Sequence, residues 1–337
     1  MSAQSWVNRI WYGKRIPPLW TMPAAMVFAA IVAARRGLYR RGWFKVSRLS
    51  CPVIVVGNLS VGGTGKTPLV CWIVDKLKAQ GRRPGIVTRG YGGSESAPQL
   101  IDGNADPVLH GDEPVMMARR AGVPVGVGRD RPAAAQLLID ANCDVIVSDD
   151  GMQHYALGRD CEIVVVDGDR RFGNGWVLPA GPLREPIARL KTADAVVVNG
   201  GRGLLDGALA MKLDGIEAVS VLGGTVRSLL SFVGDSVHAV AGIGNPDRFF
   251  NMLRAHGVQV CGHTLDDHAQ ISSQMILFDD QKPVLMTEKD AVKCAPVADA
   301  RHWFVPVTAQ FSGPDEIALL SVVGRALQTD AGRPLRS

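Results

Sequence analysis

Short apolar runs rich in β-branched residues alternate with longer helical stretches through the first two thirds of the chain. The first run, Val53–Val56, follows Pro52, and the helical pattern after it continues to about Gln80. Five further runs have the same character: Gly85–Thr88, Val123–Val127, Asp144–Ser148, Ile163–Val166 and Ala195–Val198. Buried strands that alternate with helices are typical of a doubly wound parallel α/β sheet. Such sheets bind ligands at the carboxyl ends of their strands, so the residues that follow each run are candidates for a site.

The strand and helix pattern restarts near Leu213 without a second glycine-rich loop. A helix is predicted after Asn245-Pro246, and strands are predicted at Ala218–Leu222, Val226–Val233, Val237–Ile243, Pro283–Thr287 and Phe304–Val307. We therefore expect a larger lobe over residues 49–214. A smaller α/β lobe over residues 215–330 would close over the active site.

The N-terminal segment, residues 1–48, contains an unbroken apolar run at Ala24–Ala34. Basic residues flank it on both sides, and four of the seven tryptophans lie nearby, at Trp6, Trp11, Trp20 and Trp43. Proline at positions 17, 18 and 23 predicts a helix over only about 23–34, or about 18 Å, whereas a membrane span needs about 30 Å. We therefore expect a monotopic helix on a membrane surface. A buried core helix remains an alternative, and a cleaved signal peptide is disfavoured.

Charge is distributed unevenly along the chain. The 337 residues contain 37 Lys and Arg against 32 Asp and Glu, a net charge of +5. Ten of the basic residues and none of the acidic ones precede Asp75, so the remainder is net negative. This argues against a nucleic-acid-binding protein and predicts that the N-terminal segment meets an anionic membrane surface. No obligate protein partner is predicted. The six cysteines show no regular spacing and indicate reduced thiols, and no Cys/His spacing suggests zinc.

A glycine-rich loop follows the first strand. Asn58–Thr67 reads NLSVGGTGKT, and the order of strand, loop and helix predicts a P-loop NTPase-like fold. Ser60 stands where the pattern GxxxxGK[ST] has its first glycine. Lys66 is expected to reach the β- and γ-phosphates of ATP, and the Thr67 hydroxyl to ligate Mg²⁺. The predicted nucleotide-binding residues are Ser60, Val61, Gly62, Gly63, Thr64, Gly65, Lys66 and Thr67.

Acidic pairs follow two of the later elements. Asp149 and Asp150 end the run Val145–Ser148 as a Walker B-like pair, and Asp112 and Glu113 begin a predicted helix after Gly111. With Thr67, the carboxylates of Asp149, Asp150 and Glu113 are the candidate Mg²⁺ ligands. Helix capping explains Asp112 and Glu113 equally well.

Arginines in glycine- or proline-rich loops are candidate phosphate contacts, with solvated surface positions as the alternative. They are Arg89, Arg129, Arg131 and Arg184.

Together these motifs resemble those of the tetraacyldisaccharide 4′-kinases, the lipid A 4′-kinases of Gram-negative bacteria. The matching stretches are GNLSVGGTGKTP at 57–68, TRGYGG at 88–93, GDEP at 111–114, DDGMQH at 149–154, PAGPLREP at 179–186, AGIGNPDRFF at 241–250, DDH at 266–268 and TEKDAVKC at 287–294. Ser60 belongs to this family's own form of the loop. Met152 and Asp266 depart from the family pattern, which usually has an aromatic residue and a proline there.

The resemblance implies transfer of the γ-phosphoryl group of ATP to the 4′-hydroxyl of a tetraacylated glucosamine disaccharide 1-phosphate, giving lipid IVA at the cytoplasmic face of the inner membrane. By position, Asp112 would be the base for the sugar hydroxyl, and His268 would share its proton. Lys66 would neutralise charge in the transition state. Gln153 and His154 would organise Mg²⁺-bound waters near the substrate phosphates.

Two other functions fit parts of the pattern. A membrane-attached P-loop ATPase switch of the partition type would share the loop and the anchor, but its output would be binding. A kinase for a soluble sugar or nucleoside would not need the N-terminal segment. GTP is disfavoured because Thr287–Asp290 lacks the arrangement of a guanine-binding NKxD motif.

Overall fold

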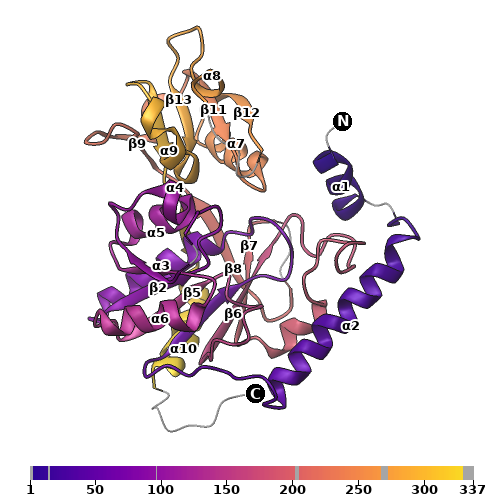
Figure 1. Cartoon of the computed structure of the whole chain (residues 1–337). Helices are drawn as coiled ribbons and strands as arrows, with labels where there is room; N and C mark the ends of the chain where they lie inside the picture. Colours follow the sequence, from indigo (N-terminus) through magenta and orange to yellow (C-terminus); the bar gives the residue numbers. More distant parts are fainter. Residues whose placement is uncertain (1–2, 14–15, 96, 202–204, 267–271, 329–337) are drawn as a thin grey trace.

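The computed structural model describes residues 3–13, 16–95, 97–201, 205–266 and 272–328. These residues form a nine-stranded sheet and a six-stranded sheet, each in its own lobe. Figure 1 shows the smaller lobe, in orange to yellow, beside helices α4 (Pro107–His110) and α5 (Asp112–Ala121) of the larger one. The predicted P-loop-type α/β architecture with a second α/β lobe is confirmed.

The larger sheet is built around strand β1 (Val53–Gly57), which pairs in parallel with β5 (Val145–Asp149) and β6 (Cys161–Asp167). The strand order is β15-β8-β7-β6-β1-β5-β2-β4-β3. The remaining strands are β2 (Pro84–Thr88), β3 (Gln99–Ile101), β4 (Val125–Val127), β7 (Ala195–Asn199), β8 (Leu209–Asp214) and β15 (Thr308–Phe311). The strands that follow β1 in sequence lie on both sides of it in the sheet. The loop after β1 therefore lies at a topological switch point, where doubly wound sheets bind ligands.

Both faces of the larger sheet are covered. Ile54 and Val56 of β1 face a core shared with α3 (Lys66–Ala79), α5 and α10 (Gly313–Leu327). Val53 and Val55 face the opposite side, where α6 (Arg131–Asp140) packs. Successive side chains of a strand point to opposite faces, so a strand buried on both faces reads as an unbroken apolar run. This is the pattern by which the sequence predicted β1, β5 and β6.

The smaller sheet has the order β10-β9-β14-β13-β11-β12. Its strands are β9 (Glu217–Ser220), β10 (Val226–Ser228), β11 (Ser236–Ala241), β12 (Gln259–Thr264), β13 (Val284–Thr287) and β14 (His302–Val305). The helices are α7 (Pro246–Ala255), α8 (Ser273–Ile276) and α9 (Glu288–Cys294), with short 3₁₀ turns η2 (Leu229–Phe232) and η3 (Ala295–Val297). The strand predicted over 226–233 stops at Ser228, because its hydroxyl accepts a hydrogen bond from the Leu230 N–H and starts η2.

The last two described elements return to the larger lobe. Strand β15 pairs antiparallel with β8, and α10 places Leu319, Val323 and Ala326 in the core of the larger sheet. Figure 1 shows α10, in yellow, with the larger lobe and away from the rest of the orange and yellow segment. Residues 215–330 were expected to form the smaller lobe, because the local pattern of a strand does not indicate which sheet it joins. In the structure the smaller sheet is an insertion between β8 and β15.

The N-terminal segment forms α1 (Ala3–Tyr12) and α2 (Thr21–Arg40), which lies along the flank of the larger lobe (Figure 1). Helix α2 is longer than predicted, because Pro23 lies in its first turn, where a missing N–H breaks no helical hydrogen bond. At about 1.5 Å per residue its 20 residues span about 30 Å, so the prediction that it is too short to cross a bilayer was wrong. Only Thr21 and Ala25 of α2 are buried, which also excludes a core helix.

Candidate active site

The P-loop between β1 and α3 is held in a tight curve by glycines and two asparagines. Gly62 and Gly65 have φ angles of 101° and 93°, in the left-handed region that favours glycine. The Asn58 side-chain amide donates to the Gly62 carbonyl at 3.2 Å, and the Asn199 amide donates to the Thr64 carbonyl at 2.9 Å. No side chain among the described residues caps the first turn of α3. Its N–H groups are therefore available to an anion such as a phosphate.

The first half of the loop rests on the segment that contains the PAGPLREP motif. The Val61 N–H donates to the Pro182 carbonyl at 2.8 Å, and Ser60 forms a backbone bridge with Leu183. Tyr12 of α1 donates its hydroxyl to the Val61 carbonyl at 3.3 Å. The P-loop is thus supported both by this downstream segment and by the N-terminal helix.

Two successive P-loop residues face two successive carboxylates at the end of β5. The Thr67 hydroxyl donates to Oδ2 of Asp149 at 3.0 Å, and Nζ of Lys66 lies 3.4 Å from Oδ1 of Asp150. The register of the sheet sets this arrangement, because Val56 of β1 pairs directly with Asp149. Both strands therefore present their carboxyl ends, and the groups that follow them, at the same edge.

Asp149 has the properties of a ligand for a hard cation. Burial raises its pKa to about 6, and Lys66 only partly opposes this effect. Its Oδ1 atom is buried and has no hydrogen-bond partner among the residues that the structure describes. A buried carboxylate oxygen without a partner, next to the Thr67 hydroxyl, fits the oxygen ligand set that Mg²⁺ prefers.

Asp150 has a different environment from its neighbour. Burial opposes its ionisation, but Lys66 and Arg184 outweigh that effect and hold its pKa below its ordinary range. Two hydrogen bonds of 2.9 and 3.2 Å join the Arg184 guanidinium to the carboxylate. Asp150 also adopts a φ of 50°, a conformation that places its side chain toward the P-loop lysine. It is therefore charged and paired, whereas burial makes Asp149 hold a proton more tightly than an ordinary aspartate does.

The other predicted arginines occupy contrasting positions. Arg131 is buried at the start of α6, donates to the Ser148 hydroxyl at 2.9 Å, and has its pKa lowered to about 10 by burial. Arg89 and Arg129 are exposed. They remain candidate phosphate contacts that are open to solvent.

The predicted polar pair after β5 supports the loop. The Gln153 amide donates to the Asn58 carbonyl at 3.1 Å and to Oε1 of Glu185 at 3.0 Å. Burial, together with Arg131 and Arg159, lowers the pKa of His154 to about 4. Its ring is therefore neutral near pH 7.

Asp112 and Glu113, in the first turn of α5, lie where the two lobes meet. Oδ2 of Asp112 is 3.3 Å from Nζ of Lys293, and Oε1 of Glu113 is 3.2 Å from Nζ of Lys289. Both lysines belong to α9 of the smaller lobe. The structure therefore brings the predicted base of the larger lobe against the smaller one. His268, its predicted partner, lies outside the described residues.

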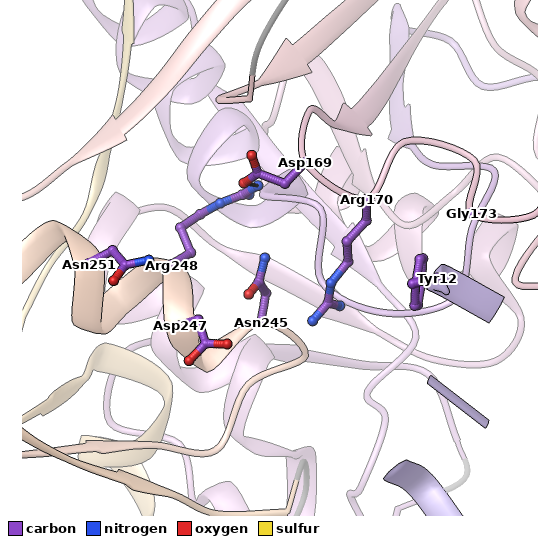
Figure 2. Close-up of a pocket in the computed structure, with 8 residues that line it drawn as sticks. All are labelled: Tyr12, Asp169, Arg170, Gly173, Asn245, Asp247, Arg248 and Asn251. Carbon is purple, nitrogen blue, oxygen red and sulfur yellow. Dashed lines mark hydrogen bonds and ion pairs between the residues drawn. The ribbon is translucent and has the colours of Figure 1, made fainter. Parts of the chain in front are cut away.

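A second contact joins the smaller lobe to the P-loop itself. A Cβ built on Gly244 would lie 2.7 Å from the Gly63 nitrogen, so the two backbones approach closely. A neighbouring cavity has a volume of about 370 Å³. Figure 2 shows Arg248 and Asn245 on one side of it and Arg170 and Tyr12 on the other. Arg248 of α7 pairs with Asp167 at the end of β6, at 2.8 Å. This cavity is where the two lobes and the N-terminal helix converge.

Several of these residues were not predicted from the sequence. Asn199 and Asp167 end strands β7 and β6, and a polar residue at the carboxyl end of a buried run was a usable signal. Lys289 and Lys293 lie four positions apart on α9, but nothing local to that helix indicates its partners on α5.

Comparison with known proteins agrees with this geometry. Residues 18–325 match the family model described as tetraacyldisaccharide-1-P 4′-kinase. The chain is 47% identical over 326 residues to the tetraacyldisaccharide 4′-kinase of Nitrosococcus oceani, covering 96% of this chain and 95% of that protein. It is 50% identical over 309 residues to the protein of the same name from Alkalilimnicola ehrlichii, covering 88% and 91%.

A solved structure has the same fold. It is the "apo" form of LpxK from Aquifex aeolicus in complex with ATP, and it superposes with a TM-score of 0.75 at 26% identity, covering 91% of this chain and 98% of that one. The resemblance seen in the motifs is confirmed along nearly the whole chain. The chain belongs to the tetraacyldisaccharide-1-P 4′-kinase family.

Proposed function

We propose that the protein transfers the γ-phosphoryl group of ATP to the 4′-hydroxyl of a tetraacylated glucosamine disaccharide 1-phosphate, a lipid A precursor. The observation that carries the proposal is the meeting of Lys66 and Thr67 with Asp150 and Asp149 at one edge of the sheet, in a chain of this family. The P-loop supplies the phosphate site. The carboxylates supply a place for a divalent cation.

The P-loop residues bind and orient the triphosphate. The open N–H groups of the first turn of α3 would contact phosphate oxygens, and Lys66 would exchange its 3.4 Å contact with Asp150 for the β- and γ-phosphates. Thr67 and Asp149 would hold Mg²⁺, which, when bound, neutralises charge on the phosphate oxygens. Arg184 would keep Asp150 in place when Lys66 moves.

Asp112 would accept the proton of the sugar 4′-hydroxyl. It stands at the start of a helix, where the helix dipole stabilises a carboxylate, and Lys293 orients it from the other lobe. A carboxylate is a weak base, so most of the rate would come from the alignment of hydroxyl and phosphoryl group. His268 would share the proton, as the family motif implies.

The N-terminal segment would bring the enzyme to its lipid acceptor. Met26, Val27 and Ile31 expose between 60% and 67% of their surface on α2, and Trp20 and Trp43 expose more than 70%. Apolar side chains flanked by arginines, with tryptophans at the ends, suit the boundary of an anionic bilayer. Helix α2 is long enough to cross a bilayer, but basic residues lie on both sides of it and favour neither orientation across a membrane. We therefore infer that α2 lies on the cytoplasmic face of the bacterial inner membrane as a monotopic anchor.

The test is incubation with γ-labelled ATP, Mg²⁺ and the disaccharide lipid in mixed micelles. Label should enter the lipid fraction, and an acceptor methylated at the 4′-oxygen should remain unlabelled. Lys66→Met should abolish labelling. Release of labelled inorganic phosphate without labelled lipid would contradict the proposal and favour the partition-type ATPase. Label in a soluble sugar but not in the lipid would favour the third alternative.

A further inference from the structure

We propose that the smaller lobe binds a divalent transition-metal ion, Zn²⁺ in the first instance, through His238, Cys261 and His263. Strands β11 and β12 run in parallel, and their register pairs His238 with Cys261 and Val240 with His263. Residues paired in this way share a face of the sheet, and so do residues two apart on one strand. The pleat therefore brings all three side chains to one face, with potential ligand atoms within 4.8 Å of one another.

The spacing of these atoms is close to that of a tetrahedral site. Nδ1 of His238 lies 2.9 Å from Nε2 of His263. With Zn–N distances near 2.0–2.1 Å and Zn–S near 2.3 Å, neighbouring ligand atoms in a tetrahedral site are roughly 3.3–3.6 Å apart. Shifts of about 1 Å or less would admit an ion between the three atoms. The fourth position would be filled by water.

A second, independent feature prepares His238 as a ligand. Its Nε2 atom lies 3.0 Å from Oδ1 of Asp280, which fixes the proton on that nitrogen and leaves the Nδ1 lone pair directed at His263. A carboxylate behind a histidine ligand is a recurrent feature of zinc sites. The Phe278 ring stacks on His238 at 3.7 Å and 16° and also contacts His263 at 4.5 Å. Both imidazoles are therefore held in place before any ion arrives.

The exposure of the three residues and the charges around them are compatible with a bound cation. His238 is buried, His263 is half-buried and Cys261 is exposed, so an ion has access from solvent on the Cys261 side. Nζ of Lys282 lies 2.8 Å from Oδ2 of Asp280, which balances its positive charge.

The set of donor atoms selects the class of ion. Two imidazole nitrogens and a thiolate suit Zn²⁺ and its neighbours Co²⁺ and Ni²⁺, whereas Mg²⁺ and Ca²⁺ take oxygen ligands. The site is thus distinct in chemistry and in lobe from the Thr67 and Asp149 pair. No zinc motif is apparent along the chain, because the ligands come from two strands that are adjacent only in space.

The position of the ion suggests what it does. Strand β12 is the edge of the smaller sheet, and most of its residues are exposed. An ion between β11 and β12 would link the two strands on one face of the sheet. Helix α7 packs against Gly262 on the opposite face. We therefore assign it a structural role in the smaller lobe, outside the phosphoryl-transfer chemistry.

The experiment uses the full chain without a polyhistidine tag, stripped with EDTA and dialysed against Co²⁺. Wild-type protein should bind one ion per chain, with a thiolate-to-cobalt charge-transfer band and the intense visible absorption of a tetrahedral site. Zn²⁺ should displace both signals and raise the melting temperature. Cys261→Ser, a change at an exposed position, should remove the charge-transfer band and the thermal shift while leaving Mg²⁺-dependent kinase activity unchanged.

Two further variants sharpen the result. Asp280→Asn should weaken Zn²⁺ binding by roughly 10–100-fold, the cost of losing a carboxylate behind a ligand. Cys51→Ser, which changes a half-buried cysteine of the larger lobe, should bind as wild type does. A charge-transfer band that persists in Cys261→Ser, or binding well below one ion per chain, would overturn the proposal. Neither readout depends on ATP or lipid, so the proposed kinase function is tested separately.

Discussion

Oδ2 of Asp112, in the larger lobe, lies 3.3 Å from Nζ of Lys293, in the smaller lobe. The neighbouring Glu113 makes a similar contact with Lys289, and Arg120, further along α5, pairs with Glu288 at 2.6 Å. The candidate base is therefore oriented by the opposite lobe. Its alignment with the P-loop depends on how the lobes are docked.

Asp112→Asn should lower kcat by roughly 10²–10⁴-fold, the usual contribution of a positioned acid–base group. The KM for ATP should change little, because the ion pair of Asp112 is with Lys293 of α9 and not with the P-loop. Steady-state kinetics with saturating lipid measure both constants. Asp75→Asn, at an exposed carboxylate on α3, is the control and should match wild type. An unchanged kcat in Asp112→Asn would remove this residue from the mechanism.

Asp149→Asn should stabilise the apo protein at neutral pH while abolishing its response to Mg²⁺. The folded pKa of about 6 lies above the ordinary value of 3.8, so the folded state binds the proton more tightly. This group therefore lowers the free energy of unfolding as pH rises from about 4 to about 6, by at most roughly 3 kcal/mol. Asparagine carries no charge, so the variant does not lose this free energy of unfolding as pH rises.

Urea unfolding of both proteins at pH 4 and pH 7.5, with and without Mg²⁺, measures the effect. The variant should be more stable than wild type at pH 7.5, and the difference should disappear at pH 4. Mg²⁺ should raise the free energy of unfolding of wild type alone. A variant that is less stable at pH 7.5, or that still responds to Mg²⁺, would contradict this account.

Gly244→Ala should impair nucleotide turnover by separating the smaller lobe from the P-loop. The added Cβ would meet the Gly63 nitrogen at 2.7 Å, a distance at which one of the two backbones must shift. A displacement near 1 Å at a site of this kind costs about 10²-fold in rate, which should appear in kcat/KM for ATP. Gly324→Ala is the matched control, because its Cβ meets nothing within 4 Å. It should add about 0.5–1 kcal/mol of stability and leave kinetics unaltered, and equal kinetics for the two variants would refute the contact.

Excision of the smaller lobe should separate nucleotide binding from catalysis. Thr308 of β15 pairs directly with Asp214 of β8, so a short Gly-Ser linker can replace residues 216–306 without straining the larger sheet. The excised protein should fold and bind ATP, as followed by a fluorescent analogue, but should lose lipid phosphorylation. Truncation after Asp214 is the comparison and should aggregate, because it also removes β15 and α10. Full kinase activity in the excised protein would show that catalysis does not need the smaller lobe.

Replacement of Met26, Val27 and Ile31 by glutamine should release the protein from membranes. These side chains are exposed on α2, and each would contribute up to about 1.5–3 kcal/mol when buried in a bilayer. Flotation with phosphatidylglycerol-containing vesicles should show affinity reduced by more than about 100-fold. Tyr12 and its contact with Val61 stay intact, so ATP binding should persist. Ile317→Gln, on α10 and 70% exposed, is the control. Undiminished vesicle binding by the triple variant would exclude α2 as the anchor.

The sequence predicted those parts of the fold that have a strong local signal. Strands β1, β5 and β6 are buried on both faces, so their residues form unbroken apolar runs. Strand β12 has no buried residue and the edge strand β15 has one, so neither forms an apolar run, and both were missed. The position of Pro23 was interpreted as a helix boundary, although a proline in the first turn costs a helix little.

In the candidate site, too, only the residues with a local signal could be predicted from the sequence. Lys66, Thr67, Asp149 and Asp150 follow strand ends, where the chain itself indicates a site. The contact of Asp112 with Lys293 joins segments 181 positions apart, and no local pattern records it. Pairings of this kind depend on how the lobes dock, which only the folded structure reveals.

The return of β15 and α10 to the larger sheet has a consequence for biosynthesis. A ribosome must translate the whole smaller lobe before it makes the helix that supplies Leu319, Val323 and Ala326 to the larger core. Until then the nascent chain presents an unfinished apolar surface beside β8. Domains emerging from the ribosome usually fold in order from the N-terminus. In this protein the first lobe to be translated would be the last to be completed. Chaperones would bind the exposed apolar surface mainly during this interval.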